Sequence, residues 1–379
     1  MLNRKETVKK NQAVISLGSN LGNRLELLQK ALVLLEQNDI KLTAISSLYE
    51  TPAWGFDSTP FYNACAQIET DFNPEELLSV FLEIEEQLGR VRQQSDGYTA
   101  RQIDLDLLFY ENLILNTDGL VLPHPRLHLR NFVLVPLKEI VPQWQHPVLN
   151  LTVNELLEQC SDQDDLEKLP FRKWSPPIFD LFPYITIEGN IGVGKTTLAH
   201  KMATVYELPL LKEAFAKNPY LEKFYADPVP YALAVEAYFL EDRINQTQLF
   251  WKQNKNKAVS DYNIHKSVVF ARQNLNSADF KDYQSRFNEN LHSQKLPNLM
   301  VYLHTDIDIL QEQIKKRGRP YEQKIKNQYL KQIEQGYQDL IQSDLPYPVV
   351  SISTKNLDFE TKEADFQSLL RIIYRASFS

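Results

Sequence analysis

The sequence GNIGVGKT at positions 189–196 is the feature that most restricts the fold of this chain. It fits the pattern GxxxxGK[ST] and lies between an apolar stretch at 184–188 and a helix expected to begin at Lys195. Glycines let backbone N–H groups surround phosphate oxygens, Lys195 reaches the outer phosphates, and the Thr196 hydroxyl can ligate Mg²⁺. We therefore expect an ATP site. Its residues are Gly189, Asn190, Ile191, Gly192, Val193, Gly194, Lys195, Thr196 and Thr197.

The length of 379 residues favours two domains, because a single domain typically has roughly 150 residues. The stretch 161–183 changes from an acidic patch to KLPFRKW and then SPPIFDLFP, and its prolines interrupt both helix and sheet. We therefore expect a linker at 163–182, a first domain at 12–162 and a second at 183–379.

Composition excludes several classes of protein. The net charge of -8 disfavours a general nucleic-acid binder. The only cysteines, Cys65 and Cys160, suggest neither a disulfide framework nor a zinc site. The N-terminal apolar run is too short for a signal peptide or a membrane span. We expect a cytoplasmic protein with buried, reduced thiols and no nucleic-acid or membrane partner.

The two expected domains differ in their order of helices and strands. In the second domain, apolar strands alternate with helices, which is typical of an α/β fold with a doubly wound parallel sheet. In the first, two helices interleave with strands, which favours an α+β ferredoxin-like sandwich with a mainly antiparallel sheet. The expected strands are 13–17, 42–50, 61–69, 103–110, 184–188, 258–260 and 299–303, and the expected helices are 23–37, 74–88, 231–255, 280–296 and one from Lys195.

Besides the phosphate loop, the second domain contains Glu213 after PLLK, the sequence NPYLEKFYADP and the lid sequence KRGRPYE at 316–322. In these features, residues 184–379 resemble the deoxynucleoside kinase family. The resemblance implies a P-loop kinase in which Glu213 takes the proton of the nucleoside 5′-hydroxyl. Arg317 and Arg319 would clamp the transferring phosphoryl group, and Tyr225 and Glu322 would meet the sugar 3′-hydroxyl. It also implies a homodimer formed through the long helices of this domain.

The third strand of this domain departs from the family pattern, which has an acid followed by arginine. Here the pair is Asp261-Tyr262. Asp261 can still serve the Mg²⁺ shell, and either Lys266 or Arg272 can replace the arginine.

Glu236 stands where the resemblance places a base-pairing glutamine. An ionised glutamate only accepts hydrogen bonds, which suits the adjacent N–H groups of guanine, whereas N1 of adenine needs a donor. Arg243, two turns along the same helix face, can neutralise Glu236 or supply that donor. Its position matches that of an arginine in purine-accepting relatives. Bacterial kinases with this fused organisation look most like deoxyadenosine kinases. We therefore expect a purine deoxynucleoside, with deoxyadenosine ahead of deoxyguanosine.

Asp104 and Asp106 lie two apart on an expected strand, so both face one side while Leu105 and Leu107 face the other. Such a pair can hold hard cations. Together with LGSNLG, ETP, FYN, GRVR and PHPR, the RQIDLDLL strand makes residues 12–162 resemble 6-hydroxymethyl-7,8-dihydropterin pyrophosphokinase, a folate-biosynthesis enzyme.

This second resemblance implies that Asp104 and Asp106 hold two Mg²⁺ ions that bridge the phosphates of ATP. Phe61 and Phe132 would sandwich the pterin, and Asn63 would bond its polar edge, beside Thr51 and Pro52. Tyr98 replaces a usual tryptophan, so loop closure over ATP is expected to differ in detail. The side chains expected to bind phosphates or stabilise the transferred group are Arg90, Arg92, Arg101, His124 and Arg130.

The leading hypothesis is two active ATP-dependent enzymes on one chain. One alternative is that one domain is catalytically silent and serves assembly or regulation; another is that the second domain is a nucleotide-triggered switch. Lys195 with Glu213, and Asp104 with Asp106, disfavour a silent domain.

Overall fold

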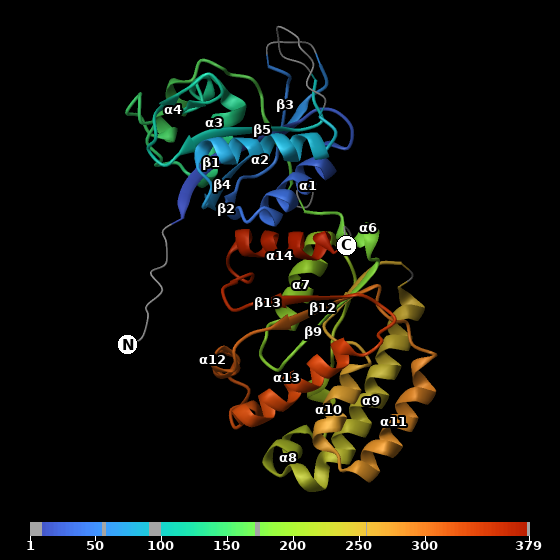
Figure 1. Cartoon of the computed structure of the whole chain (residues 1–379). Helices are drawn as coiled ribbons and strands as arrows, with labels where there is room; N and C mark the ends of the chain where they lie inside the picture. Colours follow the sequence, from blue (N-terminus) through green and yellow to red (C-terminus); the bar gives the residue numbers. More distant parts are fainter. Residues whose placement is uncertain (1–9, 55–57, 91–99, 171–174, 255, 377–379) are drawn as a thin grey trace, which may run out of the picture. The chain divides into compact units, whose positions relative to one another are not determined.

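The computed structural model describes residues 10–54, 58–90, 100–170, 175–254 and 256–376. The chain forms two compact units, Met1–Pro176 (unit 1) and Pro177–Ser379 (unit 2), each of which is described by itself (Figure 1). The boundary lies within the expected linker, yet part of that segment is ordered. β8 (Glu167–Lys168) pairs with unit 1, and α6 (Ile178–Leu181) belongs to unit 2.

Unit 1 is built on an antiparallel sheet. Its order is β5 (Asp104–Tyr110), β1 (Asn11–Ser19), β4 (Phe61–Thr70), β3 (Tyr49–Thr51) and β8, with β2 (Lys41–Ile45) also paired to β4. α1 (Arg24–Gln37) follows β1, and α2 (Pro74–Gln87) follows β4, which is the ferredoxin-like order that the sequence predicted. The smaller elements are β6 (Leu115–Asn116), β7 (Val121–Leu122), η1 (Leu127–Leu129), α3 (Asn131–Ile140) and α4 (Val153–Gln159).

The single strand expected at 42–50 is two strands. Ile45 pairs with Ala66, and Tyr49 pairs with Asn63. Tyr49 is four residues after Ile45, whereas Asn63 is only three residues before Ala66, so one residue between β2 and β3 is extra. The extra residue breaks the ladder, and the Ser46 hydroxyl accepts a hydrogen bond from the Cys65 backbone N–H there.

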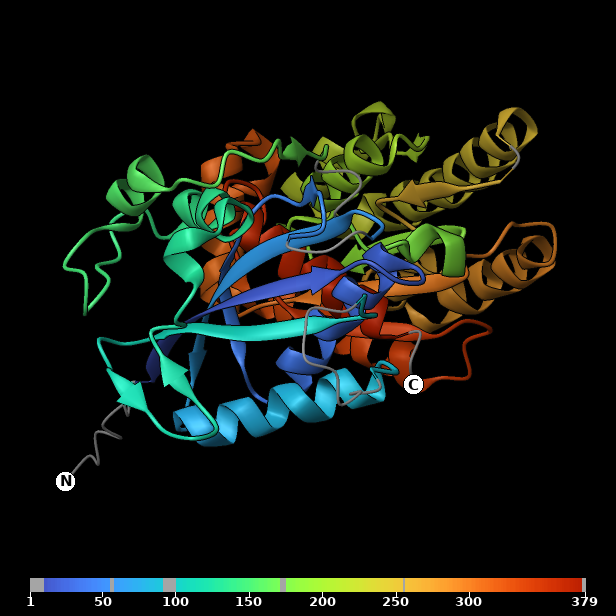
Figure 2. The same cartoon turned by 90° about the horizontal axis from the view of Figure 1, so that it is seen from above.

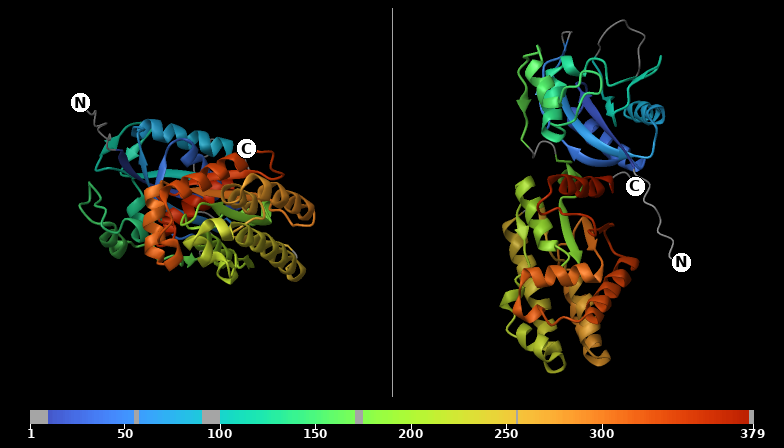
Figure 3. Two further views of the ribbon diagram at one scale, coloured as in Figure 1. Left: turned by 90° about the horizontal axis from the view of Figure 1, so that it is seen from below. Right: turned by 90° about the vertical axis from the view of Figure 1, so that its left-hand side faces the viewer.

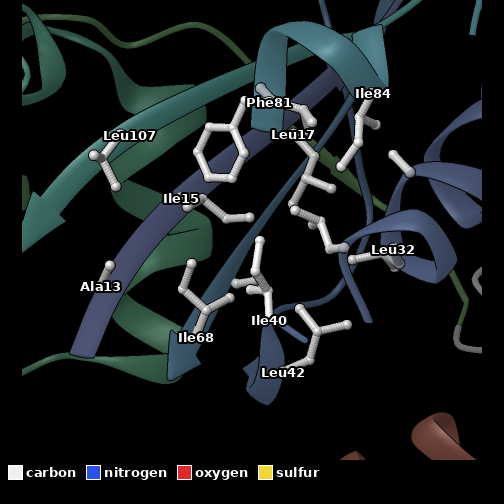
Figure 4. Packing of buried hydrophobic residues seen from close by; sticks show 14 of the residues in the cluster. Ala13, Ile15, Leu17, Leu32, Ile40, Leu42, Ile68, Phe81, Ile84 and Leu107 are labelled. Atoms are coloured by element: carbon white, nitrogen blue, oxygen red, sulfur yellow. The ribbon is translucent and has the colours of Figure 1, made fainter. Parts of the chain in front are cut away.

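The two faces of β1 have different partners. Ala13, Ile15 and Leu17 pack against α1 and α2 in an apolar core (Figure 4). Val14, on the opposite face, packs against α3 and α4. Figures 2 and 3 show α2 on one side of the sheet and α3 on the other. The α3 face carries the polar side chains described below.

Unit 2 has a parallel sheet, as predicted, and the sheet contains five strands. The order is β10 (Leu210–Leu211), β11 (Ala258–Ser260), β9 (Tyr184–Gly189), β12 (Leu299–His304) and β13 (Val349–Ser353), of which β13 was not among the expected strands. Helices cover both faces (Figure 1). They are α7 (Lys195–Tyr206), η2 (Phe215–Lys217), α8 (Leu221–Ala226), α9 (Pro228–Gln253), α10 (Lys266–Asn274), α11 (Ser277–Leu291), α12 (Ile307–Arg317), η3 (Pro320–Glu322), α13 (Asn327–Gln342) and α14 (Glu363–Arg375).

Two helices of unit 2 begin earlier than expected. α9 begins at Pro228, whose fixed φ suits a first helical position. α11 begins at Ser277 because the Asn276 side chain caps it, accepting hydrogen bonds from the N–H groups of Ala278 and Asp279.

No helix in the described part of the chain is both long and apolar enough to span a bilayer. Cys65 and Cys160 are buried free thiols, as expected.

Candidate active sites

The phosphate loop of unit 2 leaves the carboxyl end of β9, where ligands of parallel sheets commonly bind. A Cβ atom at Gly189 would lie 2.2 Å from the carbonyl oxygen of Leu303, so only glycine fits there. Lys195 donates to the carbonyl oxygens of Gly189, at 2.9 Å, and Asn190, at 2.8 Å. Burial and the nearby Lys266 ammonium lower the pKa of Lys195 to about 7, whereas phosphate oxygens would favour its charged form.

The side chain of Asn190 faces the protein interior. Its amide donates to the carbonyl oxygen of Leu330 at 2.8 Å and to Glu334 at 3.1 Å, and its oxygen accepts from the Ile191 N–H. Asn190 therefore ties the loop to α13, and its backbone is the part that can serve the ATP site.

The phosphate loop lies between two cavities. Gly192, Lys195 and Thr196 line both. Such a loop suits transfer between a phosphate donor in one cavity and an acceptor in the other. The first cavity also contains the side chains that the sequence assigned to the base, the sugar, the metal and the phosphoryl group: Glu213, Tyr225, Glu236, Arg243, Asp261, Arg317, Arg319 and Glu322. Arg317 and Arg319 line the second cavity too. The second is lined by Val193, Gly194, Thr197, Lys316 and residues 357–361.

Asp261 connects the phosphate loop to Glu213. One carboxylate oxygen accepts from the Thr196 hydroxyl at 2.5 Å, and the other accepts from the Glu213 backbone N–H at 2.7 Å. Asp261 and Thr196 thus lie together, as a shared Mg²⁺ ligand set requires.

Glu213 is held by two cations. Arg243 donates through Nε at 3.0 Å and Nη2 at 2.7 Å to Oε1, and Lys266 lies 2.5 Å from Oε2. Burial would raise the pKa of Glu213, but Lys266 and Arg243 outweigh burial and lower it to about 2. Glu213 is therefore held in its ionised form, which is the form that a general base requires. Of the two residues considered as substitutes for the missing arginine, Lys266 reaches the cavity and Arg272 is exposed.

The sequence offers Arg243 either as a group that neutralises Glu236 or as a donor to the base, and the structure gives each of the two side chains another direct partner. The Arg243 guanidinium is occupied by Glu213 and by the Ser267 hydroxyl at 2.7 Å. Glu236 instead accepts from the Asn274 amide, with 2.7 Å from Nδ2 to Oε1. The cause is packing: α10 lies against α9 and brings Asn274 to Glu236.

Glu236 is a buried carboxyl with one oxygen available. Among the described residues, its Oε2 has no hydrogen-bond partner, and the side chain lines the acceptor cavity. Burial raises the pKa of Glu236 to about 7, aided by Glu213, although Asn274, Arg243 and Lys266 act in the other direction. The group can therefore be a donor or an acceptor near neutral pH.

The lid brings the predicted sugar-binding residues together. The Tyr225 ring stacks on Tyr321 with 5.6 Å between centroids, next to Glu322. Glu322 is buried and forms ion pairs with Arg317 and, at 3.1 Å, with Arg319. In this arrangement Glu322 holds both arginines at the rim of the cavity.

Asp104 and Asp106 of unit 1 lie on the α3 face of the sheet, opposite Gly18 and Ser16 in register. Asp104 is bound by Arg90 at 2.6 Å and Arg101 at 2.9 Å. Burial and the charge of Asp104 raise the pKa of Asp106 to about 7, because both disfavour a second negative charge at this place.

This donor set fits Mg²⁺. A divalent cation between the two carboxylates would remove their repulsion. Within the described ranges, no cluster of three or more His, Cys, Asp or Glu side chains could hold a metal in either unit. Mg²⁺ would accordingly take further ligands from phosphates, as it commonly does.

The predicted pterin residues share one pocket with the aspartates. The pocket is lined by Ser16, Gly18, Pro52, Trp54, Phe61, Asn63, Arg101, Asp104, Asp106, Arg130 and Phe132. Thr51 lies behind it and accepts from the Asn63 amide at 2.7 Å. This bond leaves the amide oxygen of Asn63 for the polar edge of a heterocycle.

His124, an expected phosphate-binding residue, makes a contact within its own loop. The His124 Nδ1 accepts from the Arg126 N–H at 3.2 Å, and burial and Arg130 lower its pKa to about 4. A neutral His124 can donate only through Nε2. Arg92 and Tyr98 lie outside the described residues.

Several residues of the sites were missed by the sequence reasoning. In unit 1 these are Trp54, whose ring lies 5.0 Å from the Arg130 guanidinium, and Glu85, which accepts from Arg90 and from the Leu105 N–H. In unit 2 it is Asn274, 38 residues from Glu236. Trp54, two residues after Thr51-Pro52, could have been suspected from its position. Asn274 gives no local signal, because Glu236 lies 38 residues away, and for Glu85 the contact that joins it to the Asp104 strand is with Leu105, 20 residues away.

Comparison with known proteins gives a separate match for each unit. Residues 14–142 match the family model of 7,8-dihydro-6-hydroxymethylpterin-pyrophosphokinase, and residues 185–376 match that of deoxynucleoside kinase. Deoxyguanosine kinase of Bacillus subtilis (strain 168) is 31% identical over 194 residues, which cover 49% of this chain and 94% of that protein. The 2-amino-4-hydroxy-6-hydroxymethyldihydropteridine pyrophosphokinase of the same organism is 43% identical over 135 residues, 35% of this chain and 80% of that protein.

A longer relative matches unit 1 alone. The folic acid synthesis protein fol1 of Pneumocystis carinii is 42% identical over 163 residues, 42% of this chain, but the chain spans only 22% of that protein. The fold of each unit and the residues that line its pocket agree with these matches. The chain therefore belongs to two families, the 7,8-dihydro-6-hydroxymethylpterin-pyrophosphokinases through unit 1 and the deoxynucleoside kinases through unit 2.

Proposed function

We propose that the chain catalyses two ATP-dependent transfers. Unit 1 would move a pyrophosphoryl group from ATP to 6-hydroxymethyl-7,8-dihydropterin, and unit 2 would move the γ-phosphoryl group to the 5′-hydroxyl of a purine deoxynucleoside, with deoxyadenosine preferred. The observation that carries the second assignment is one cavity that holds Lys195, the ionised Glu213 and the base-facing candidate Glu236. For unit 1 it is the pocket that joins Asp104 and Asp106 to Phe61 and Phe132.

In unit 2, the nucleoside 5′-oxygen would attack the γ-phosphorus while its proton passes to Glu213, and the bond to the β-phosphate oxygen breaks to release ADP. Lys195 and the lid residues Arg317 and Arg319 would stabilise the charge of the transferring group. Tyr225 and Glu322 would bind the 3′-hydroxyl. Mg²⁺, held by Thr196 and Asp261, would neutralise phosphate charge.

In unit 1, the hydroxymethyl oxygen of the pterin would attack the β-phosphorus of ATP and lose its proton to solvent, and the bond from that phosphorus to the α-phosphate oxygen would break to release AMP. The flat pterin would lie between Phe61 and Phe132, with Asn63 at its polar edge. Arg101 and Arg130, which line the same pocket, would bind phosphate oxygens, and Arg90, His124 and Arg92 would assist them. Mg²⁺ at Asp104 and Asp106 would neutralise phosphate charge.

A direct test is ATP consumption by the whole chain with the four deoxynucleosides and with hydroxymethyl-dihydropterin. We expect turnover with the pterin and with deoxyadenosine, less with deoxyguanosine and least with the pyrimidine nucleosides. A preference for thymidine would contradict the purine assignment. Failure to use either the pterin or every deoxynucleoside would favour the alternative in which one domain is catalytically silent.

The preference between the purines is expected to depend on pH. Below the raised pKa of Glu236, about 7, the protonated carboxyl offers one donor and one acceptor, which suits N1 and the amino group of adenine. Above it, the carboxylate only accepts, which suits the N–H groups of guanine. Between about pH 6 and about pH 8, the ratio of kcat/KM for deoxyadenosine to that for deoxyguanosine should fall by at least about tenfold.

The control for this prediction is Glu236→Gln, which fixes one donor and one acceptor at every pH. Its ratio should stay constant over the same range and favour deoxyadenosine. A wild-type ratio that does not change with pH, or a variant that prefers deoxyguanosine, would contradict the role given to Glu236.

The assembly proposed is a homodimer through unit 2. Val229 and Leu233, one helical turn apart on α9, are exposed apolar side chains, 89% and 46% accessible. Burial of such a surface favours association. The mass measured by sedimentation should be twice that of one chain, and in Leu233→Glu it should fall to the mass of one chain. A monomeric wild type would contradict the proposed homodimer.

A further inference from the structure

The position after Asp261 carries no cation. Tyr262 stands there, and its side chain is only 1% exposed. A phenol is uncharged at neutral pH. Any positive charge that the reaction needs next to Asp261 must therefore come from elsewhere.

Lys266 brings an ammonium to this region from the first residue of α10. Its side chain is 8% exposed, and Nζ lies 2.5 Å from Oε2 of Glu213. Burial of an ammonium is unfavourable without an anionic partner, so this pair is a built part of the cavity wall rather than a surface contact. Arg272, by contrast, is exposed and places its guanidinium 5.3 Å from the ring centre of Phe280.

The two oxygens of Glu213 are held from different helices. Arg243 on α9 binds Oε1 and is itself fixed by the Ser267 hydroxyl at 2.7 Å. Lys266 on α10 binds Oε2, and Asp261 accepts from the Glu213 backbone N–H at 2.7 Å. Because three contacts fix the residue, the orientation of Oε2, the oxygen opposite Arg243, is set by Lys266.

Lys266 and Lys195 line the same cavity as Glu213. Each side chain ends in an ammonium group, so their like charges repel each other. Two ammonium groups in one cavity are favourable when an anion lies against both. An ammonium has three donors, so Lys266 can bind Glu213 and a phosphate oxygen at the same time.

We propose that Lys266 is the positioning residue for Glu213 and supplies the cation that Tyr262 does not. It holds Oε2 toward the nucleoside 5′-hydroxyl and turns its remaining N–H donors to the transferring phosphoryl group. The proton passes from the 5′-oxygen to Glu213, and Lys266 neither gives nor takes one. This inference rests on the deoxynucleoside kinase activity proposed for unit 2.

The test compares Lys266→Met with the matched control Arg272→Met in the full chain. We expect kcat for deoxyadenosine to fall by about 10²-fold in Lys266→Met, with KM changed by less than about threefold. Arg272→Met should keep wild-type values. Turnover of hydroxymethyl-dihydropterin by the same preparations measures the concentration of intact chain, and thermal unfolding measures the stability of unit 2.

Two further variants separate positioning from simple charge neutralisation. Lys266→Arg should retain more activity than Lys266→Met, and added ethylammonium should partly restore Lys266→Ala. If Lys266→Met unfolds, Lys266→Gln replaces it in the same comparison.

Three results are decisive against parts of this model. A kcat in Lys266→Met within about threefold of wild type would overturn the role of Lys266. Loss of nucleoside binding as large as the loss of turnover, without rescue by ethylammonium, would show that Lys266 only neutralises buried charge and would overturn it too. A wild-type chain that turns over the pterin but phosphorylates no deoxynucleoside would instead overturn the proposed function of unit 2.

Discussion

Lys195→Ala is expected to reduce deoxynucleoside phosphorylation by about 10³-fold or more and to leave pterin turnover at the wild-type level. Lys195 is the phosphate-loop cation that lines both cavities of unit 2, so alanine removes the charge that the transferring phosphoryl group meets. Unit 1 has its own carboxylate pair and arginines. The measurement is initial rate with each acceptor, on one preparation.

The matched control for that variant is Lys281→Ala, which removes an exposed lysine from α11. It should change neither activity. If Lys195→Ala also removes most pterin turnover from a chain that unfolds at the wild-type temperature, the two active sites are not independent, and the model of two separate enzymes is wrong.

Asp106→Asn and Asp104→Asn are expected to reduce pyrophosphoryl transfer by about 10²-fold or more, because a neutral amide loses the charge that fixes divalent ions. Burial and the charge of Asp104 both raise the pKa of Asp106, and Asp106→Asn removes this buried carboxylate, so the folded unit should be at least as stable as the wild type. Deoxynucleoside phosphorylation should not change. Rates with both acceptors over a range of Mg²⁺ concentrations are the measurement.

Asp118→Asn, at an exposed position of unit 1, is the control for these variants. Pterin turnover near the wild-type rate in both Asp104→Asn and Asp106→Asn would show that the pair is only a feature of the strand. A loss that high Mg²⁺ partly reverses would support a role in metal binding.

The sequence by itself determined the features that depend on neighbouring residues. The spacing of Gly189, Gly192, Gly194 and Lys195 predicts a strand, a phosphate loop and a helix, and these are what the chain forms. The alternation along β5 predicts that Leu105 enters the apolar core while the aspartates face the opposite side, and this is confirmed. Both rules are local, because backbone geometry sets which face a side chain takes.

Only the tertiary structure decided which charged groups pair. Glu236 and Arg243 share the face of α9, yet Arg243 pairs with Glu213, 30 residues away, and Glu236 with Asn274. Lys266 reaches Glu213 across 53 residues. Spacing along one helix shows which charged pairs are possible. Packing of the helices decides which pairs form, because a buried charge needs a partner and can use only the groups that packing brings within reach.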